Sequence, residues 1–202
     1  MLGQAMTVDE VLAEVLQDRV FYEESGGGVT FSGGEPLGQP DFLRELLRAC
    51  HASGISTAVD TCGYAPWEQL AAVAPFTDLF LYDLKTIDDK RHVEYTGVSN
   101  KLILSNLKAL GRIHANIWVR VPIVPGFNDD AAALEAIGRF AAAVPSVRQV
   151  NLLPYHETGA NKFARLGRSY PAGEVPRLSP VQMAAAAETF RAAGMTNIHT
   201  GG

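Results

Sequence analysis

The feature that most constrains the fold is a regular alternation of short, apolar, β-rich runs with amphipathic helical segments. The first helical segment starts at a capping box, Thr7-Val8-Asp9-Glu10, and is expected to end near Tyr22. The expected strands are 29–32, 56–59, 79–82, 117–121, 150–153 and 196–200, and the later helices are 40–53, 66–74, 99–113, 129–144 and 179–194. Short apolar strands that alternate with helices are typical of parallel sheets. The sequence therefore predicts an α/β fold, either a parallel sheet or a parallel (β/α) barrel.

The chain is expected to form a single domain over residues 1–202. Its length suits one domain, and no internal repeat or low-complexity tract interrupts the alternation. The polar connection 157–177, which contains Pro and Gly, is long enough to be a functional loop. Proteins built from βα repeats usually begin with a strand, whereas this chain begins with a helix. We therefore expect a first strand upstream of Met1.

The charge and the cysteine count exclude several function classes. There are 17 Lys and Arg residues against 22 Asp and Glu residues, so the net charge is −5, which argues against a nucleic-acid partner. No apolar run approaches the ~18 residues of a membrane span, and no signal-peptide pattern is present, so a cytoplasmic protein with no membrane partner is expected. The two cysteines, Cys50 and Cys62, are too few and too far apart for a zinc ribbon, a C-x-x-C pair or a disulfide framework.

Polar residues follow the apolar strands at the point where each strand ends. They are Gly33-Gly34-Glu35, Asp60-Thr61, Asp83-Leu84-Lys85 and His156, while Arg120 lies within the strand 117–121. In a parallel barrel the carboxyl ends of the strands share one face, where such folds build their active sites. The sequence therefore predicts that these residues converge on one opening.

The glycines and the glutamate each allow two interpretations. Gly33 and Gly34 can form a tight turn, or they can let a ligand approach the backbone. Glu35 can be a solvated charge at the rim, or it can pair with an ammonium group.

The other candidate residues also leave alternatives open. Asp83 can pair with Lys85, or it can join Asp60 in holding a hard cation through oxygen ligands. His156 can be an ordinary loop histidine, although its place at a strand end favours a functional role.

Five segments together resemble one known family. They are residues 26–37, 60–64, 83–85, 120–129 and 152–156, with the sequences GGGVTFSGGEPL, DTCGY, DLK, RVPIVPGFND and LLPYH. In this order they are similar to glycyl-radical-enzyme activating enzymes, which are radical S-adenosylmethionine (SAM) proteins related to pyruvate formate-lyase activating enzyme. The resemblance covers essentially the whole chain.

The resemblance implies a role for each of these residues. Gly33, Gly34 and Glu35 would bind the amino group of SAM, Lys85 of the Asp83-Leu84-Lys85 motif would contact its carboxylate or ribose, and His156 would contact the nucleoside. Asp60, Thr61, Asp83 and the Leu81 carbonyl match a site for a monovalent cation beside the SAM carboxylate. Arg120 would lie near the bound peptide loop of the partner enzyme.

The resemblance also implies a reaction. A [4Fe–4S] cluster would cleave SAM reductively to give a 5′-deoxyadenosyl radical, which removes a hydrogen atom from a glycine Cα of a partner glycyl radical enzyme. An external donor such as flavodoxin or ferredoxin would supply the electron. The cofactor carries this chemistry, and the protein positions it.

This chain departs from the family at the cluster. The family binds it through a C-x-x-x-C-x-x-C loop that follows the first strand, whereas this chain has no such motif and only two cysteines. The expected fold is therefore a partial parallel (β/α) barrel of the radical SAM type that lacks its first strand. We expect these 202 residues to be the SAM-binding part of such an activating enzyme and to be inactive alone.

Two other functions stay open. The chain could be a non-catalytic module that binds SAM or a partner through the same face. It could instead be a cluster-free barrel lyase with Lys85 as a Schiff-base nucleophile, although the other motifs would then have no role.

Overall fold

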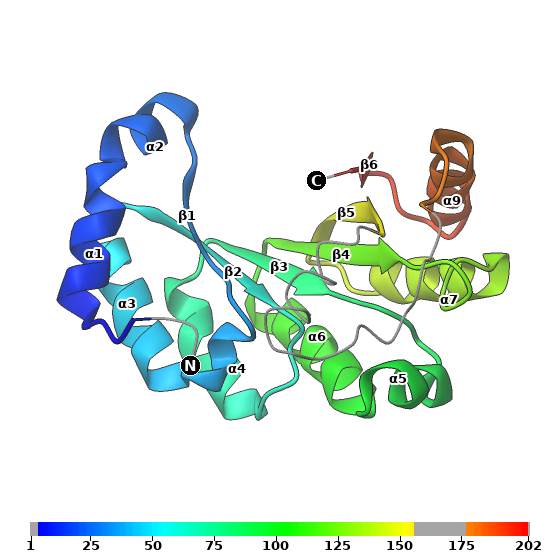
Figure 1. The fold of residues 1–202 in the computed structure, drawn as a ribbon, viewed down its shortest axis with the longest axis horizontal. Coiled ribbons are helices and arrows are strands. Elements are labelled where there is room, and N and C mark those ends of the chain that lie inside the picture. The colour runs from blue at the N-terminus through cyan, green and yellow to red at the C-terminus, as the bar shows by residue number, and fades with distance from the viewer. Residues whose placement is uncertain (1–3, 156–176, 202) are drawn as a thin grey trace. The chain divides into compact units, whose positions relative to one another are not determined.

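The computed structural model describes residues 4–155 and 177–201 (Figure 1). The strands are β1 (Gly28–Phe31), β2 (Ser56–Thr61), β3 (Leu79–Asp83), β4 (Ile117–Ile123), β5 (Val147–Pro154) and β6 (Ile198–Thr200). The α-helices are α1 (Val8–Gln17), α2 (Arg19–Ser25), α3 (Pro40–Ala52), α4 (Trp67–Val73), α5 (Asp89–Thr96), α6 (Lys101–Ile113), α7 (Ala131–Ala142) and α9 (Pro180–Ala192). Short 3-10 turns lie at Pro36–Gly38 and Ala74–Phe76.

The strands hydrogen-bond in chain order, β1-β2-β3-β4-β5-β6. The pairs β1–β2, β2–β3 and β5–β6 are parallel, as the alternation of strands and helices predicted. The described chain divides into two compact units, one of residues 1–82 and 102–118 and one of residues 83–101 and 119–202, and each unit is described by itself.

In the first unit, helices α1 and α3 lie side by side next to β1 and β2 (Figure 1). The amphipathic faces of the two helices explain this packing, since Val15 of α1 meets Leu46 and Cys50 of α3 in a buried cluster. Val29 and Phe31 of β1 pack against the same cluster. One face of β1 is thereby partly buried, and the residues that follow the strand lie at its carboxyl end.

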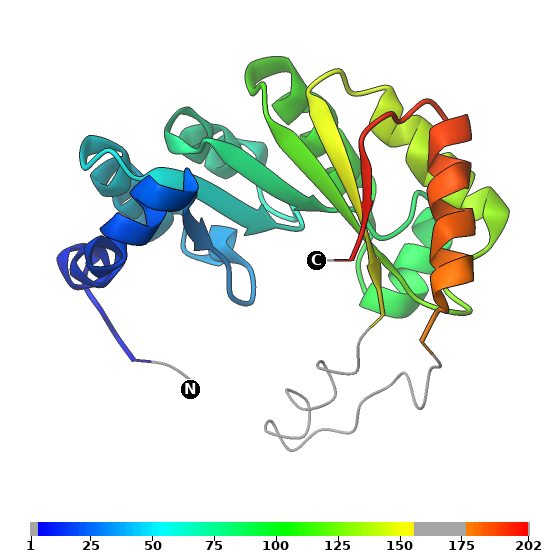
Figure 2. The same ribbon diagram turned by 90° about the horizontal axis from the view of Figure 1, so that it is seen from above.

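In the second unit, α7 and α9 pack against each other and against β5 (Figure 2). Gly138 of α7 permits the close approach, because a Cβ added there would lie 2.8 Å from the Cβ of Ala193. The capping box at Ser179, with Pro180 following, starts α9 as its sequence predicts.

Several boundaries differ from those expected. The helix expected to run from the capping box to Tyr22 is wrong as a single element, because Asp18 leaves helical geometry and separates α1 from α2. The apolar spacing does not continue beyond this break, so Phe21 is 66% exposed. Helix α5 was not expected, because its sequence DKRHVEYT has no apolar periodicity and buries only His92. Strand β5 begins at Val147, three residues before its predicted start.

Candidate functional site

The turn after β1 presents open backbone. Gly33 has φ +135°, a conformation that residues with a Cβ rarely adopt, and no atom lies within 4 Å of a Cβ built at Gly33 or Gly34. Both glycines are exposed. The turn therefore leaves peptide groups exposed, and both interpretations of the two glycines, a tight turn and the approach of a ligand, stay open.

Glu35 joins this turn to the end of β2. Its Oε1 accepts hydrogen bonds from the Thr61 hydroxyl at 2.6 Å and from the Leu37 amide at 3.1 Å. Its Oε2 accepts from the amide and the thiol of Cys62, both at 3.0 Å. The expected contact of Glu35 with an ammonium group stays a prediction, and the geometry adds a structural role that the sequence did not reveal.

We expect the Glu35→Gln substitution to lower the free energy of unfolding by about 1–2 kcal/mol. Each carboxylate oxygen of Glu35 accepts two hydrogen bonds. A glutamine keeps one acceptor oxygen, but its NH₂ group would face the two donors that the other oxygen now accepts from. Urea unfolding would measure the change, with Glu24→Gln on the exposed surface of α2 as the matched control. Equal stability of Glu35→Gln and the control would show that Glu35 does not hold the turn.

The segment that follows β2 is fixed by buried side chains of the same unit. Asn106 donates from Nδ2 to the carbonyl oxygens of Gly63 and Ala65, both at 2.8 Å. Gly63 has φ +68°, and a Cβ there would lie 1.8 Å from the hydroxyl oxygen of Tyr82. Tyr82 is fully buried and donates to the Ile103 carbonyl at 2.8 Å. Burial, together with the nearby Cys62 and Glu35, raises the pKa of Tyr82 well above its usual range.

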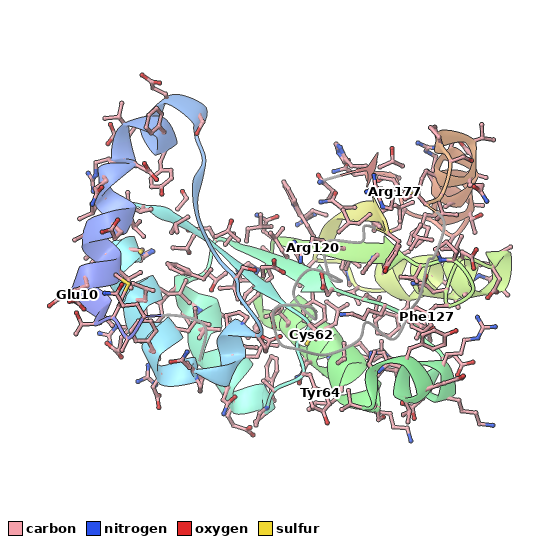
Figure 3. All side chains as sticks on the ribbon, viewed as in Figure 1. Glu10, Cys62, Tyr64, Arg120, Phe127 and Arg177 are labelled. Atoms are coloured by element: carbon pink, nitrogen blue, oxygen red, sulfur yellow. The ribbon has the colours of Figure 1, made fainter. Side chains whose placement is uncertain are left out.

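The candidate cation ligand Asp60 lies at the end of β2 in the same unit. Its Oδ2 accepts a hydrogen bond from the Ser32 hydroxyl at 3.0 Å, so it is linked to the residue that precedes the glycine turn. Thr61, the next candidate ligand, is buried, and its hydroxyl donates to Glu35. Leu81, whose carbonyl is the third candidate, lies in β3. Figure 3 labels Cys62 and Tyr64, which follow β2.

In the second unit, Asp83 lies between two cationic side chains. Arg120 donates from Nε and Nη2 to Asp83 Oδ1 at 3.0 and 2.9 Å, and Lys85 Nζ lies 3.6 Å from Asp83 Oδ2. The pairing of Asp83 with Lys85, one of the two alternatives for this residue, is therefore present. The sequence did not predict that Arg120 would also hold Asp83.

The backbone of the same motif is fixed by β4 and by the loop after it. Leu84 is buried, and its amide donates to the Arg120 carbonyl at 2.9 Å. Asn128, fully buried, donates from Nδ2 to the carbonyl oxygens of Lys85 at 2.6 Å and Pro122 at 2.9 Å. Its Oδ1 accepts from the Val124 amide at 2.8 Å. The side chain of Asn128 thus links the Asp-Leu-Lys motif to the Val-Pro-Gly turn.

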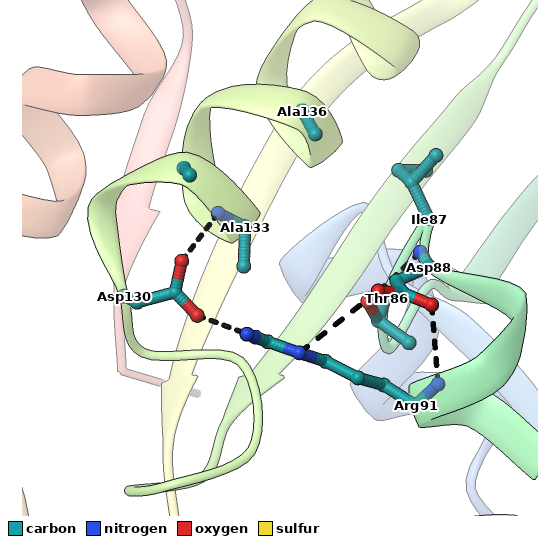
Figure 4. A pocket seen from close by; sticks show the side chains of 8 residues that line it. Thr86, Ile87, Asp88, Arg91, Asp130, Ala133 and Ala136 are labelled. Atoms are coloured by element: carbon teal, nitrogen blue, oxygen red, sulfur yellow. Dashed lines mark hydrogen bonds and ion pairs between the residues drawn. The ribbon is translucent and has the colours of Figure 1, made fainter.

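Side chains of helix α5 also hold the Val-Pro-Gly turn. The Arg91 guanidinium pairs with Asp130, the N-cap of α7 (Figure 4). It also donates to the Phe127 carbonyl at 3.2 Å. The hydrogen bond from Arg91 lowers the pKa of the Asp130 carboxyl. Arg91 also lines a cavity of about 220 Å³ at this point. Tyr95 donates to the Gly126 carbonyl at 3.2 Å, so α5, which the sequence did not predict, holds the turn that carries Asn128.

The remaining predictions concern His156, the cation site and the membrane. His156 and most of the connection 157–177 fall outside the described residues. The cation site would combine Asp60, Thr61 and Leu81 of the first unit with Asp83 of the second, and it stays a prediction. Among residues 4–155 and 177–201, no helix is long and apolar enough to cross a membrane.

The residues of this chain do not fit a [4Fe–4S] cluster, which needs three thiolates. Cys50 is buried in the core of the first unit, and burial raises the pKa of its thiol, which disfavours the thiolate. The thiol of Cys62 donates a hydrogen bond to the Glu35 carboxylate. Within the described ranges, no group of three or more His, Cys, Asp or Glu side chains could hold a metal ion.

Comparison with known proteins shows which family this chain is similar to. The family model for the radical SAM superfamily matches residues 2–137. The chain is 49% identical over 175 residues to the isethionate sulfite-lyase activating enzyme of Nitratidesulfovibrio vulgaris, a match that covers 86% of this chain and 56% of that protein. It is 41% identical over 203 residues to the trans-4-hydroxy-L-proline dehydratase activating enzyme of Clostridioides difficile, covering 100% of this chain and 67% of that protein.

A solved structure supports the same relationship. The crystal structure of a domain of pyruvate-formate lyase-activating enzyme from Bacteroides vulgatus superposes with a TM-score of 0.73 at 31% identity, covering 87% of this chain and 99% of that one. This similarity confirms the α/β fold of the radical SAM type. The chain spans from just over half to two thirds of the length of the two activating enzymes matched by sequence.

Proposed function

The chain belongs to the radical SAM superfamily, and from this premise we propose that it is the SAM-binding part of an enzyme that activates a glycyl radical enzyme. The observation that carries the proposal is the placement of the sequence motifs. The open glycine turn follows β1, and the Asp83-Leu84-Lys85 motif begins at the end of β3. The matched relatives, which are named as activating enzymes, support the same function.

The residues of each unit suit the parts of SAM assigned to them. In the first unit, the exposed peptide groups of Gly33 and Gly34 can accept hydrogen bonds from an ammonium group, and Glu35 keeps the turn in place. In the second unit, Lys85 can bind a carboxylate, and Asn128 fixes its backbone. His156 is proposed to contact the nucleoside. When SAM lies beside a reduced [4Fe–4S] cluster, it supplies radical chemistry that can remove a hydrogen atom from a glycine of the partner enzyme.

The cluster is not assigned to residues of this chain, because the two cysteines do not provide a ligand set. We propose that its ligands lie outside these 202 residues, and that an external donor such as flavodoxin or ferredoxin reduces it. We also propose that the assembled protein works in the cytoplasm. No step through the cluster is assigned to the described side chains.

We expect the 202-residue chain to bind SAM, and the Lys85→Ala substitution to weaken that binding about tenfold, because it removes a charge-assisted contact worth roughly 1.5 kcal/mol. Isothermal titration calorimetry would measure both affinities. Lys90→Ala, which removes the same charge from an exposed position on α5, is the control and should bind SAM as the wild type does. Undetectable SAM binding by the folded wild-type chain would refute the proposal.

A further inference from the structure

The side chains after β3 continue the alternation of the strand beyond its end. Strand β3 ends at Asp83, whose side chain is 23% exposed. Burial still alternates after this residue, because Leu84 and Thr86 are each 1% exposed, whereas the side chain of Lys85 is 33% exposed. Successive side chains of an extended chain point to opposite sides. Lys85 therefore lies on the same side as Asp83, and its Nζ is 3.6 Å from Asp83 Oδ2.

Side-chain amides bind the backbone of this stretch where a neighbouring strand would otherwise do so. Asn128 donates from Nδ2 to the Lys85 carbonyl at 2.6 Å. Asn100, which is 1% exposed, donates from Nδ2 to the Thr86 carbonyl at 2.9 Å. Two successive carbonyl oxygens are thus bound by buried asparagines from two different segments of the second unit. A buried carbonyl that loses its donor must find another, so each amide constrains the direction of the backbone at Lys85.

Asn100 is itself held at the start of α5. Its amide donates to Asp89 Oδ1 at 3.0 Å, and the Ser99 hydroxyl donates to the same oxygen at 2.6 Å. The side chain of Asn100 reaches Thr86, three residues before Asp89. Both its backbone and its side chain therefore return to the residues around the beginning of α5. The helix and the turn after it form a loop that brings Asn100 back to the end of β3.

We propose that Asn100 is a positioning residue for Lys85. Together with Asn128, it continues the hydrogen bonding of β3 past Asp83 and keeps the Lys85 ammonium on the side where Asp83 lies. Without the Asn100 amide, the Thr86 carbonyl turns to another donor, and the alternation that orients Lys85 is lost. The consequence for SAM binding rests on the proposed function, whereas the effect on the position of Lys85 does not.

Competitive acetylation of lysines tests the position of Lys85 without any ligand. The protein and its Asn100→Ala variant are treated with a trace of acetic anhydride. Mass spectrometry then measures the acetylation of Lys85 relative to that of Lys108, which is exposed on α6. The ratio should rise about threefold in Asn100→Ala, because the ammonium group of Lys85 would leave a partly exposed ion pair and become more accessible.

Asn106→Ala is the matched control for this experiment. Asn106 is also a buried asparagine that binds carbonyl oxygens, but it lies in the first unit. Its substitution should destabilise the protein and leave the Lys85 ratio unchanged. An unchanged ratio in Asn100→Ala, or an equal rise in both variants, would overturn the inference.

A second variant serves if Asn100→Ala does not fold. Asn100→Ser fills more of the space, but its side chain is too short to span the same distance to the Thr86 carbonyl. Trimethylamine N-oxide, which favours the folded state, is added to all samples. The ratio should rise in Asn100→Ser as well, and a ratio equal to that of the wild type contradicts the inference.

SAM affinity gives a further test, which rests on the proposed function. Isothermal titration calorimetry compares the wild type, Asn100→Ala, Lys85→Ala and the double variant. Asn100→Ala should weaken SAM binding about threefold when Lys85 is present and have no effect when Lys85 is absent, because it acts through that lysine. Equal losses in both backgrounds contradict the inference. A wild type that binds no SAM refutes the proposed function alone, and the acetylation ratio then decides the inference.

Discussion

Replacing Gly63 by alanine should lower the free energy of unfolding by about 3 kcal/mol or more, because two independent penalties add. The backbone at φ +68° disfavours any residue with a Cβ by about 1 kcal/mol. The added Cβ would also lie 1.8 Å from the Tyr82 hydroxyl oxygen and 2.3 Å from Cζ, so a fully buried ring must move, and overpacking of this kind costs roughly 1–3 kcal/mol. Urea unfolding followed by circular dichroism would measure the loss.

Gly54→Ala is the matched control for this substitution. Gly54 has nearly the same backbone angle, φ +70°, but no atom lies within 4 Å of a Cβ built there. Only the conformational penalty should remain, about 1 kcal/mol. If the two variants lose the same stability, the contact between Gly63 and Tyr82 has no energetic importance.

Asn128→Ala should lower the free energy of unfolding by about 3–4 kcal/mol, because it leaves the Lys85 and Pro122 carbonyls and the Val124 amide without their partner. These groups surround a side chain with no solvent exposure, so water cannot easily replace it. Asn128→Asp should also destabilise the fold, since a carboxylate cannot donate to two carbonyl oxygens. Chemical denaturation would measure both variants.

Asn116→Ala provides the comparison for Asn128. The Asn116 side chain donates to the Asp78 carbonyl at 3.1 Å in an exposed position, so its loss should cost less than about 1 kcal/mol. If Asn128→Ala lost no more stability than Asn116→Ala, the link between the Asp-Leu-Lys motif and the Val-Pro-Gly turn would not stabilise the fold. SAM affinity should fall in Asn128→Ala, because Lys85 loses its backbone anchor.

The sequence predicts the strands and the larger helices because their apolar periodicity is strong. The helices α3 and α9, for example, begin at the prolines where they were expected. Helix α5 escapes such reasoning, since it buries one residue and depends on the Asp88 cap and on contacts of Arg91 and Tyr95 with a distant loop. Periodicity carries no information about such long-range contacts.

In the candidate site too, the sequence predicts where residues lie but not which partners they bind. Residues at strand ends are visible in the sequence, because a parallel sheet places them predictably. Their hydrogen-bond partners are not visible: Thr61 and Cys62 bind Glu35 across 26 and 27 positions, and Arg120 reaches Asp83 across 37. The role of Asn128 was missed for the same reason, although its place beside the Pro125-Gly126 turn, where buried asparagines often satisfy loop backbone, could have suggested it.

The buried amide of Asn128 also sets a rule for building chimeric enzymes. Because one side chain satisfies the backbone of Lys85 on one segment and of Pro122 and Val124 on another, residues 83–85 and 122–128 form a single module for transplantation. A graft that imports a relative's loop without an amide donor at position 128 would detach the lysine of the recipient's Asp-Leu-Lys motif. Segment exchange between homologous activating enzymes should therefore carry both stretches together.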